Sequence, residues 1–102
     1  MWLFVFFDLP THTKTERKEY TKFRKELLKN GYTMLQYSVY IRHCSSQENA
    51  AMHKTRVQRA LPDKGHVSIL QVTDKQYEKI LNFWGVHLKK PDQGSINQLE
   101  LF

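Results

Sequence analysis

The strongest constraint on the fold is an uninterrupted apolar segment at the start of the chain. Residues 2–7 are all aromatic or aliphatic, and the segment stops at Asp8, Leu9 and Pro10. It is too short to span a bilayer, no basic segment precedes it, and a charge and a proline follow at once, so we expect neither a secretion signal nor a membrane partner. A continuous apolar run of this length is typical of a central strand buried on both faces.

The pattern then changes from strand to helix over residues 13–31. Thr13 and Glu16 have the spacing of a capping box, and Asn30 with Gly31 supplies a stop signal. Between these ends, apolar residues recur at helical spacing, and they are Tyr20, Phe23 and Leu27. The segment is therefore predicted to be a long amphipathic helix.

Strand and helix patterns alternate along the middle of the chain. Residues 32–43 are rich in β-branched and aromatic residues and predict either one bent strand or two. A second helical pattern opens at Ser45 with Glu48 and ends at Pro62. Its apolar side chains are Met52, Val57, Ala60 and Leu61. Residues 67–73 then predict another strand.

The last part of the chain has weaker signals. After Asp74 the apolar spacing fits a helix, although residues 80–84 would equally suit a short strand. We divide the chain into a domain over residues 1–88 and a C-terminal tail over residues 89–102. The tail resembles a linker, yet it finishes with three apolar residues that we expect to dock on a partner or on a second copy, namely Leu99, Leu101 and Phe102.

The order of these segments predicts an α+β fold of the ferredoxin-like sandwich type, βαββαβ, with an extra C-terminal strand. A chain of 102 residues has room for one core. Helices covering one face of a sheet would build that core. Many unrelated proteins share this architecture, so the fold alone does not name a function.

Charge and cysteine content narrow the class of partner and the compartment. Sixteen Lys and Arg residues against ten Asp and Glu give a net charge of +6, which favours a polyanion such as DNA or RNA. Cys44 is the single cysteine, so the chain forms neither an internal disulfide nor a cysteine-based zinc site, and a prokaryotic, reducing cytoplasm fits best. None of the histidines has zinc-ligand spacing, and we expect most of them at the surface, these being His12, His43, His53, His66 and His87.

Asp8 is the most informative single position, because it places a carboxylate at the end of a buried strand. One interpretation is a turn-forming aspartate that bonds to nearby backbone. The other is a ligand for Mg²⁺ or Mn²⁺, which require about six oxygen ligands. One carboxylate is too few, so this interpretation needs a homodimer in which a twofold axis brings two copies of Asp8 together around the ion. The ion would then activate water against a phosphodiester.

Basic residues also follow one side of the predicted first helix. They are Lys18, Lys22, Lys25 and Lys29, flanked by Arg17 and Arg24. Such a ridge can follow a phosphate backbone without reading bases. The alternative is a solvated face of Glu–Lys pairs, since Glu26 lies within pairing distance of two of these lysines. Arg42 is a further candidate phosphate contact, and Tyr37 and Tyr40 would either stack on bases or serve as core or interface residues.

Three motifs together resemble the Cas2 family of CRISPR adaptation proteins. They are Phe-Phe-Asp-Leu-Pro at residues 6–10, the basic helix over residues 13–31, and Gln-Tyr-Ser-Val-Tyr at residues 36–40. The resemblance extends through residues 65–85 and is closest to members found beside the single-effector nuclease of type II systems. It implies a ferredoxin-like homodimer that binds double-stranded DNA and bridges two dimers of the CRISPR integrase subunit during spacer acquisition.

The resemblance also implies roles for individual residues. Asp8 occupies the position of a metal-binding, catalytic aspartate in a family described as metal-dependent endonucleases of RNA or double-stranded DNA. That aspartate is not generally needed for integration, so its presence does not establish cleavage. Ser38 and Arg42 would lie near the metal, and Trp2 departs from the smaller or basic residue expected there. The residues expected against duplex DNA are Lys14, Arg17 and Lys18.

Two other classes of function stay open at this stage. A free-standing toxin-type endoribonuclease shares the fold and would also use Asp8, but it would purify with an antitoxin rather than with an integrase. A small-molecule-binding regulator of the same fold would show no salt-dependent affinity for DNA.

Overall fold

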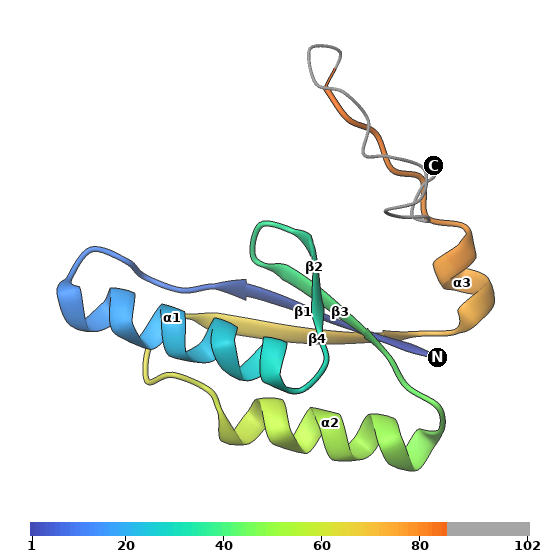
Figure 1. The fold of residues 1–102 in the computed structure, drawn as a ribbon, viewed down its shortest axis with the longest axis horizontal. Coiled ribbons are helices and arrows are strands. Elements are labelled where there is room, and N and C mark those ends of the chain that lie inside the picture. The colour runs from blue at the N-terminus through green and yellow to red at the C-terminus, as the bar shows by residue number, and fades with distance from the viewer. Residues whose placement is uncertain (86–102) are drawn as a thin grey trace.

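The apolar run that opens the chain forms β1 (Trp2–Asp8), which lies between two antiparallel neighbours, β3 (Val39–His43) and β4 (His66–Val72). With β2 (Thr33–Gln36) at the edge, the strand order is β2-β3-β1-β4. This computed structural model describes residues 1–85 (Figure 1). Within them, the predicted α+β class and the βαββαβ order of elements are confirmed.

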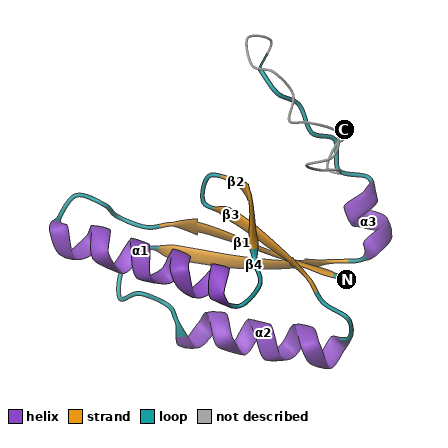
Figure 2. Ribbon diagram, in the orientation of Figure 1, coloured by secondary structure: helices purple, strands orange, loops and turns teal. Residues whose placement is uncertain are grey.

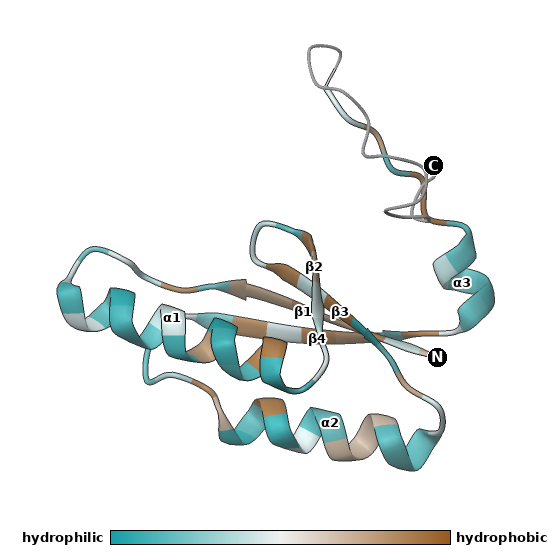
Figure 3. Cartoon of the chain, in the orientation of Figure 1, coloured by the Kyte–Doolittle hydropathy of each residue, from teal (hydrophilic) through white to brown (hydrophobic). Residues whose placement is uncertain are grey.

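Two helices, α1 (Lys14–Lys29) and α2 (Gln47–Arg59), lie along the same side of the sheet (Figure 2). Alternation along β1 directs Leu3, Val5 and Phe7 into the core that these helices cover. The strands are mostly hydrophobic, whereas the two helices carry long hydrophilic stretches (Figure 3). The central strand is less completely buried than predicted, because Phe6 on its other face is 38% exposed.

The first helix has the predicted ends. Thr13 accepts a hydrogen bond from the Glu16 amide at 3.0 Å, and the Glu16 carboxylate accepts one from the Thr13 amide at 3.0 Å, which completes the capping box. The Glu16 carboxylate accepts hydrogen bonds from the backbone amides of Thr13 and His12, and these bonds, that from Thr13 first, hold the pKa of Glu16 below its usual value. Asn30 is the C-cap, and Gly31 follows with a φ of 87°, a left-handed conformation that favours glycine.

The second helix corrects two sequence-based predictions. Its N-cap is Ser46, which accepts from the Asn49 amide at 3.0 Å, and not Ser45. Its buried residues are Ala50, His53 and Val57, while the predicted core residues Met52 and Leu61 are exposed. The buried positions follow helical spacing on a face that differs from the one traced by the most apolar side chains, so a histidine expected at the surface lies in the core.

Residues 32–43 form two strands, which settles the alternative that the sequence left open. A two-residue turn joins Gln36 to Val39, and Ser38 in this turn has a φ of 64°. The Ser38 carbonyl accepts a hydrogen bond from the Phe7 amide at 3.1 Å. The hairpin turn is thereby fixed beside the end of β1.

The third helix, α3 (Asp74–Glu78), lies beyond the end of the sheet (Figure 1). The Trp2 ring stacks on Tyr77 with centroids 3.9 Å apart and planes 10° from parallel, so this unexpected tryptophan anchors α3. Residues 80–84 are neither helix nor strand, contrary to both predictions for them. The predicted tail, its extra strand and the docking residues Leu99, Leu101 and Phe102 lie outside the described residues. No helix within residues 1–85 is long and apolar enough to cross a membrane.

Candidate functional site

Asp8 is the last residue of β1, and its side chain is exposed. Within residues 1–85 the carboxylate makes no hydrogen bond or ion pair. The turn-forming interpretation requires a bond from nearby backbone to this carboxylate, and that bond is absent from the same part of the chain. An unpaired carboxylate on the end of a rigid strand is positioned to bind a cation from outside.

The neighbour of Asp8 in the sheet is His66, the first residue of β4 and directly opposite in register. Opposite residues of an antiparallel pair point to the same face, which here is the face that carries Phe6 rather than the helix-covered core. The side chain of His66 is exposed as well. The sequence predicts only a surface position for His66, because nothing in a single strand reveals its register against another.

The two residues predicted to lie near the metal behave differently. Ser38 lies at the Asp8 end of the sheet, where its carbonyl binds the amide of Phe7. Arg42 lies opposite Leu3, near the other end of β1, because β3 is antiparallel to β1 and its later residues recede from Asp8. This placement corrects the expectation for Arg42, which belongs to neither the Asp8 end nor the surface of α1.

The Arg42 side chain contributes instead to a buried polar cluster that sequence analysis did not identify. Its Nε atom is buried without a hydrogen-bond partner in residues 1–85, and the same is true of the Tyr32 hydroxyl and both ring nitrogens of His53. Burial raises the pKa of Tyr32 to about 12. Burial, followed by the charges of Arg42 and Arg56, lowers the pKa of His53.

The basic face of α1 consists of five exposed lysines spaced three or four residues apart, namely Lys14, Lys18, Lys22, Lys25 and Lys29. They border a shallow groove of about 730 Å³. In the described part of the chain none of them forms an ion pair, and the Glu26 carboxylate accepts from Asn30 Nδ2 at 3.2 Å instead. The alternative of a face neutralised by Glu–Lys pairs is therefore not what the structure shows.

Arg17 differs from the lysines beside it. Its guanidinium donates to the carbonyls of Thr11 and His12 at 3.2 and 3.1 Å, which ties the loop after Asp8 to α1. A second groove, of about 620 Å³, runs between α1 and α2. Its lining includes the basic side chains of Lys22, Lys29, Arg56 and Arg59. Glu19 and Glu26 line the same groove, so these four basic side chains leave it net positive from one helix to the other.

The two candidate stacking tyrosines are separated by burial. Tyr40 is 1% exposed and belongs to the core, whereas Tyr37 in the hairpin turn is 78% exposed. The Tyr37 ring packs against Tyr20 of α1, with centroids 6.3 Å apart and planes 25° from parallel. A hydrogen bond with Tyr20 is the main cause that raises the pKa of Tyr37. Tyr37 is therefore the one of the two that presents a ring to solvent.

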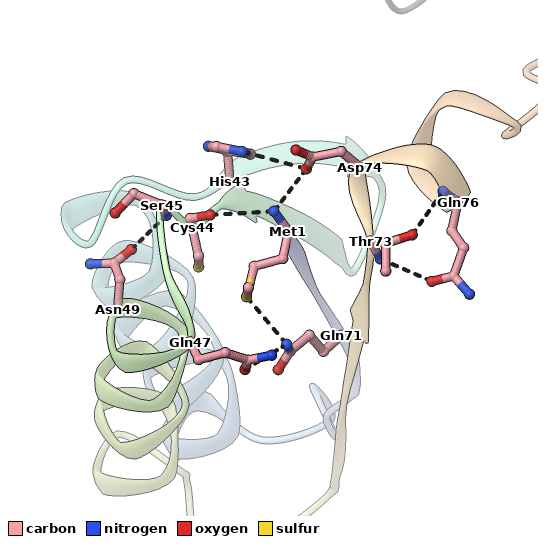
Figure 4. A network of polar contacts seen from close by, with 10 residues as sticks. All are labelled: Met1, His43, Cys44, Ser45, Gln47, Asn49, Gln71, Thr73, Asp74 and Gln76. Carbon is pink, nitrogen blue, oxygen red and sulfur yellow. Dashed lines mark hydrogen bonds and ion pairs between the residues drawn. The ribbon is translucent and has the colours of Figure 1, made fainter.

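The opposite end of the sheet is closed by internal polar contacts (Figure 4). The Asp74 carboxylate accepts from the Met1 amine at 2.7 Å and lies 3.5 Å from His43 Nε2. The contact with the Met1 amine is the largest cause that lowers the pKa of Asp74. A histidine and an aspartate thus occur at both ends of the sheet, but the side chains of Asp8 and His66 have no such partners within residues 1–85.

No group of three or more His, Cys, Asp or Glu side chains in residues 1–85 is arranged to hold a metal ion. Asp8 offers one carboxylate, so a single copy supplies fewer ligands than Mg²⁺ or Mn²⁺ requires. The side chains present fit a divalent cation only when a second copy, water or phosphate completes the set.

Comparison with known proteins agrees with this architecture. A family model described as "CRISPR associated protein Cas2" matches residues 1–80. A CRISPR-associated endoribonuclease Cas2 of Flavobacterium psychrophilum is 48% identical over the whole chain and 88% of its own length. The one of Parvibaculum lavamentivorans is 47% identical over the full length of both. A crystal structure of Streptococcus pyogenes Cas2 superposes with a TM-score of 0.60, at 22% identity, over 83% of this chain and all of the other. The chain therefore belongs to the Cas2 family of CRISPR-associated proteins.

Proposed function

We propose that this chain is the homodimeric, DNA-binding subunit that bridges dimers of the CRISPR integrase while new spacers are acquired. The observation that carries the proposal is the basic face of α1, whose five lysines form no ion pair with residues 1–85. Lysines left unneutralised along one helix face are available to bind the phosphates of a duplex. Membership of the Cas2 family supplies the CRISPR context.

Pairing of two ferredoxin-like sandwiches through their sheets is supported by the face that α1 and α2 leave uncovered. On that face Phe6 is 38% exposed and Leu70 is 50% exposed. The register places Val39 beside Phe6 and Leu70 beside Phe4, which is itself buried, so Phe6 and Leu70 are exposed apolar side chains on the same face of neighbouring strands and form an apolar patch. A second copy of the chain would bury this patch. Asp8 lies on the same face, as a shared metal site requires.

A metal-dependent endonuclease activity at Asp8 is the second part of the proposal. The relatives are named endoribonucleases, which favours RNA as a substrate in addition to double-stranded DNA. Two copies of Asp8, one from each protomer, would hold Mg²⁺ or Mn²⁺, and the bound ion would supply activated water for phosphodiester hydrolysis. The exposed ring of Tyr37 could stack on an unpaired base of a single-stranded substrate.

Salt dependence of duplex binding tests the proposed DNA-binding role. Each lysine–phosphate contact contributes roughly 0.9 to the slope of log affinity against log salt concentration, so replacing Lys14, Lys18 and Lys22 by alanine should lower that slope by about 3. Replacing Lys54, Lys75 and Lys79 by alanine removes the same net charge away from the basic face and should leave the slope nearly unchanged. Equal effects of the two sets would contradict a specific role for α1.

The variant Asp8→Ala distinguishes the proposed DNA-binding role from the proposed nuclease activity. We expect this variant to lose Mg²⁺-dependent cleavage of RNA or duplex DNA while it retains duplex affinity. Co-purification with the integrase subunit supports the bridging role, whereas co-purification with an antitoxin would favour the toxin-type endoribonuclease. If Asp8→Ala cleaved as fast as the unaltered protein, Asp8 would not be a catalytic residue.

A further inference from the structure

We propose that His66 supplies a nitrogen ligand to the divalent ion at Asp8, so that this site binds a first-row transition-metal ion such as Mn²⁺ in preference to Mg²⁺. The inference rests on the proposed metal role of Asp8 and adds the ligand that decides which metal is bound. Carboxylate oxygens accept Mg²⁺ readily, whereas an imidazole nitrogen is a ligand for transition metals and a poor one for Mg²⁺.

The register of the sheet brings the two side chains together. Asp8 and His66 are directly opposite each other across β1 and β4. In such a pair the Cβ atoms lie about 4.5–5.5 Å apart on the same face of the sheet. Metal–ligand distances of about 2.0–2.2 Å allow a carboxylate and an imidazole at this separation to meet at one ion.

Gly65 fixes this arrangement from the backbone. It adopts a φ of 99°, and a Cβ placed on it would lie 2.8 Å from the Asp8 carbonyl oxygen and 2.6 Å from Leu9 Cδ2. The beginning of β4 therefore packs directly on the end of β1, and only a residue without a side chain permits that approach. The spacing of the Asp8–His66 pair is thus set before any metal arrives.

Both side chains are available to an ion. The side chains of Asp8 and His66 are exposed and make no hydrogen bond or ion pair with residues 1–85. At the other end of the same face, Asp74 already accepts from the Met1 amine and lies 3.5 Å from His43 (Figure 4). His43 is consequently a matched control: the same residue type on the same face, six residues along β1 from the proposed site.

The test uses the full chain loaded with Mn²⁺ alone, observed by electron spin-echo envelope modulation. A directly coordinated imidazole produces a ¹⁴N modulation on Mn²⁺, which a merely nearby histidine does not. We expect the modulation in the unaltered protein and in His43→Gln, and its loss in His66→Gln. Calorimetric titration should show that His66→Gln weakens Mn²⁺ binding by about tenfold and changes Mg²⁺ affinity by less than about twofold.

Three outcomes would overturn the inference. The first is a ¹⁴N modulation that persists in both His66→Gln and His66→Asn, each shown by circular dichroism to be folded. The second is Mn²⁺ binding that depends on Asp8 but shows no ¹⁴N modulation, which would leave the metal role of Asp8 intact. The third is Mn²⁺ affinity that Asp8→Ala leaves unchanged, which would also remove the proposed metal site itself.

Discussion

Replacement of Gly65 by alanine is the most direct test of how the site is built. Two costs add at this position. The backbone φ of 99° lies in the region that L side chains rarely adopt. The added methyl group would also lie 2.8 Å from the Asp8 carbonyl oxygen, which belongs to the central strand and cannot rotate aside. Gly65→Ala should therefore destabilise the fold and displace the end of β1 relative to β4.

The expected magnitude follows from the two costs. A left-handed conformation for alanine costs about 1–2 kcal/mol. Forcing a methyl group into a filled site costs about 1–3 kcal/mol more. For a chain of this size, a loss of 1 kcal/mol lowers the melting temperature by about 4–8 °C, so a decrease of at least about 8 °C is expected for Gly65→Ala.

Gly31→Ala is the matched control, because Gly31 also has a positive φ, of 87°. There the atom nearest to an added Cβ is Nη1 of Arg42, at the far end of a flexible side chain. Gly31→Ala should therefore incur the conformational cost and little of the steric one. The difference between the two variants isolates the contact with Asp8, and we expect it to be about 1–3 kcal/mol.

The assay is equilibrium denaturation by urea, followed by circular dichroism at one fixed protein concentration, since the stability of the proposed dimer would depend on concentration. Equal free energies of unfolding for Gly65→Ala and Gly31→Ala would refute the reasoning, because they would show that the backbone at Asp8 yields without cost. Mn²⁺ binding to Gly65→Ala provides a second readout, and it should weaken together with stability.

The remaining predictions concern two buried side chains, His53 of α2 and Cys44, which precedes that helix. Because burial lowers the pKa of His53 from its ordinary value of 6.5, the unfolded chain takes up a proton before the folded one does. The contribution of His53 to the free energy of unfolding is therefore complete above pH 6.5 and is lost as the pH falls below that value. Urea denaturation at pH 7.5 and pH 5.5 should show this loss. His53→Phe should reduce it while changing stability at pH 7.5 by less than about 1 kcal/mol, since the His53 ring makes no hydrogen bond with residues 1–85. Cys44 is 1% exposed and burial raises the pKa of its thiol, so iodoacetamide at pH 8 should alkylate it about 100-fold more slowly in the folded protein than in urea, and equal rates would contradict its burial.

Local signals in the sequence determined most of the element order. The capping box at Thr13, the stop at Asn30–Gly31 and the apolar run before Asp8 act over a few residues, so they can be recognised without knowledge of the rest of the chain. The second helix was assigned a wrong cap and a wrong buried face, because adjacent serines both satisfy the capping rule and only contact with the sheet decides which side of the helix is covered.

The candidate site divides in the same way. The sequence alone identified Asp8 and the basic face of α1, since a carboxylate that ends an apolar strand and lysines at helical spacing are local patterns. It misplaced Arg42 and gave His66 no role, because both depend on how β1 aligns with β3 and β4. That register is a long-range property. Antiparallel pairing with β3 places Arg42 far from Asp8, whereas antiparallel pairing with β4 places His66 beside it, and only the assembled sheet fixes both alignments.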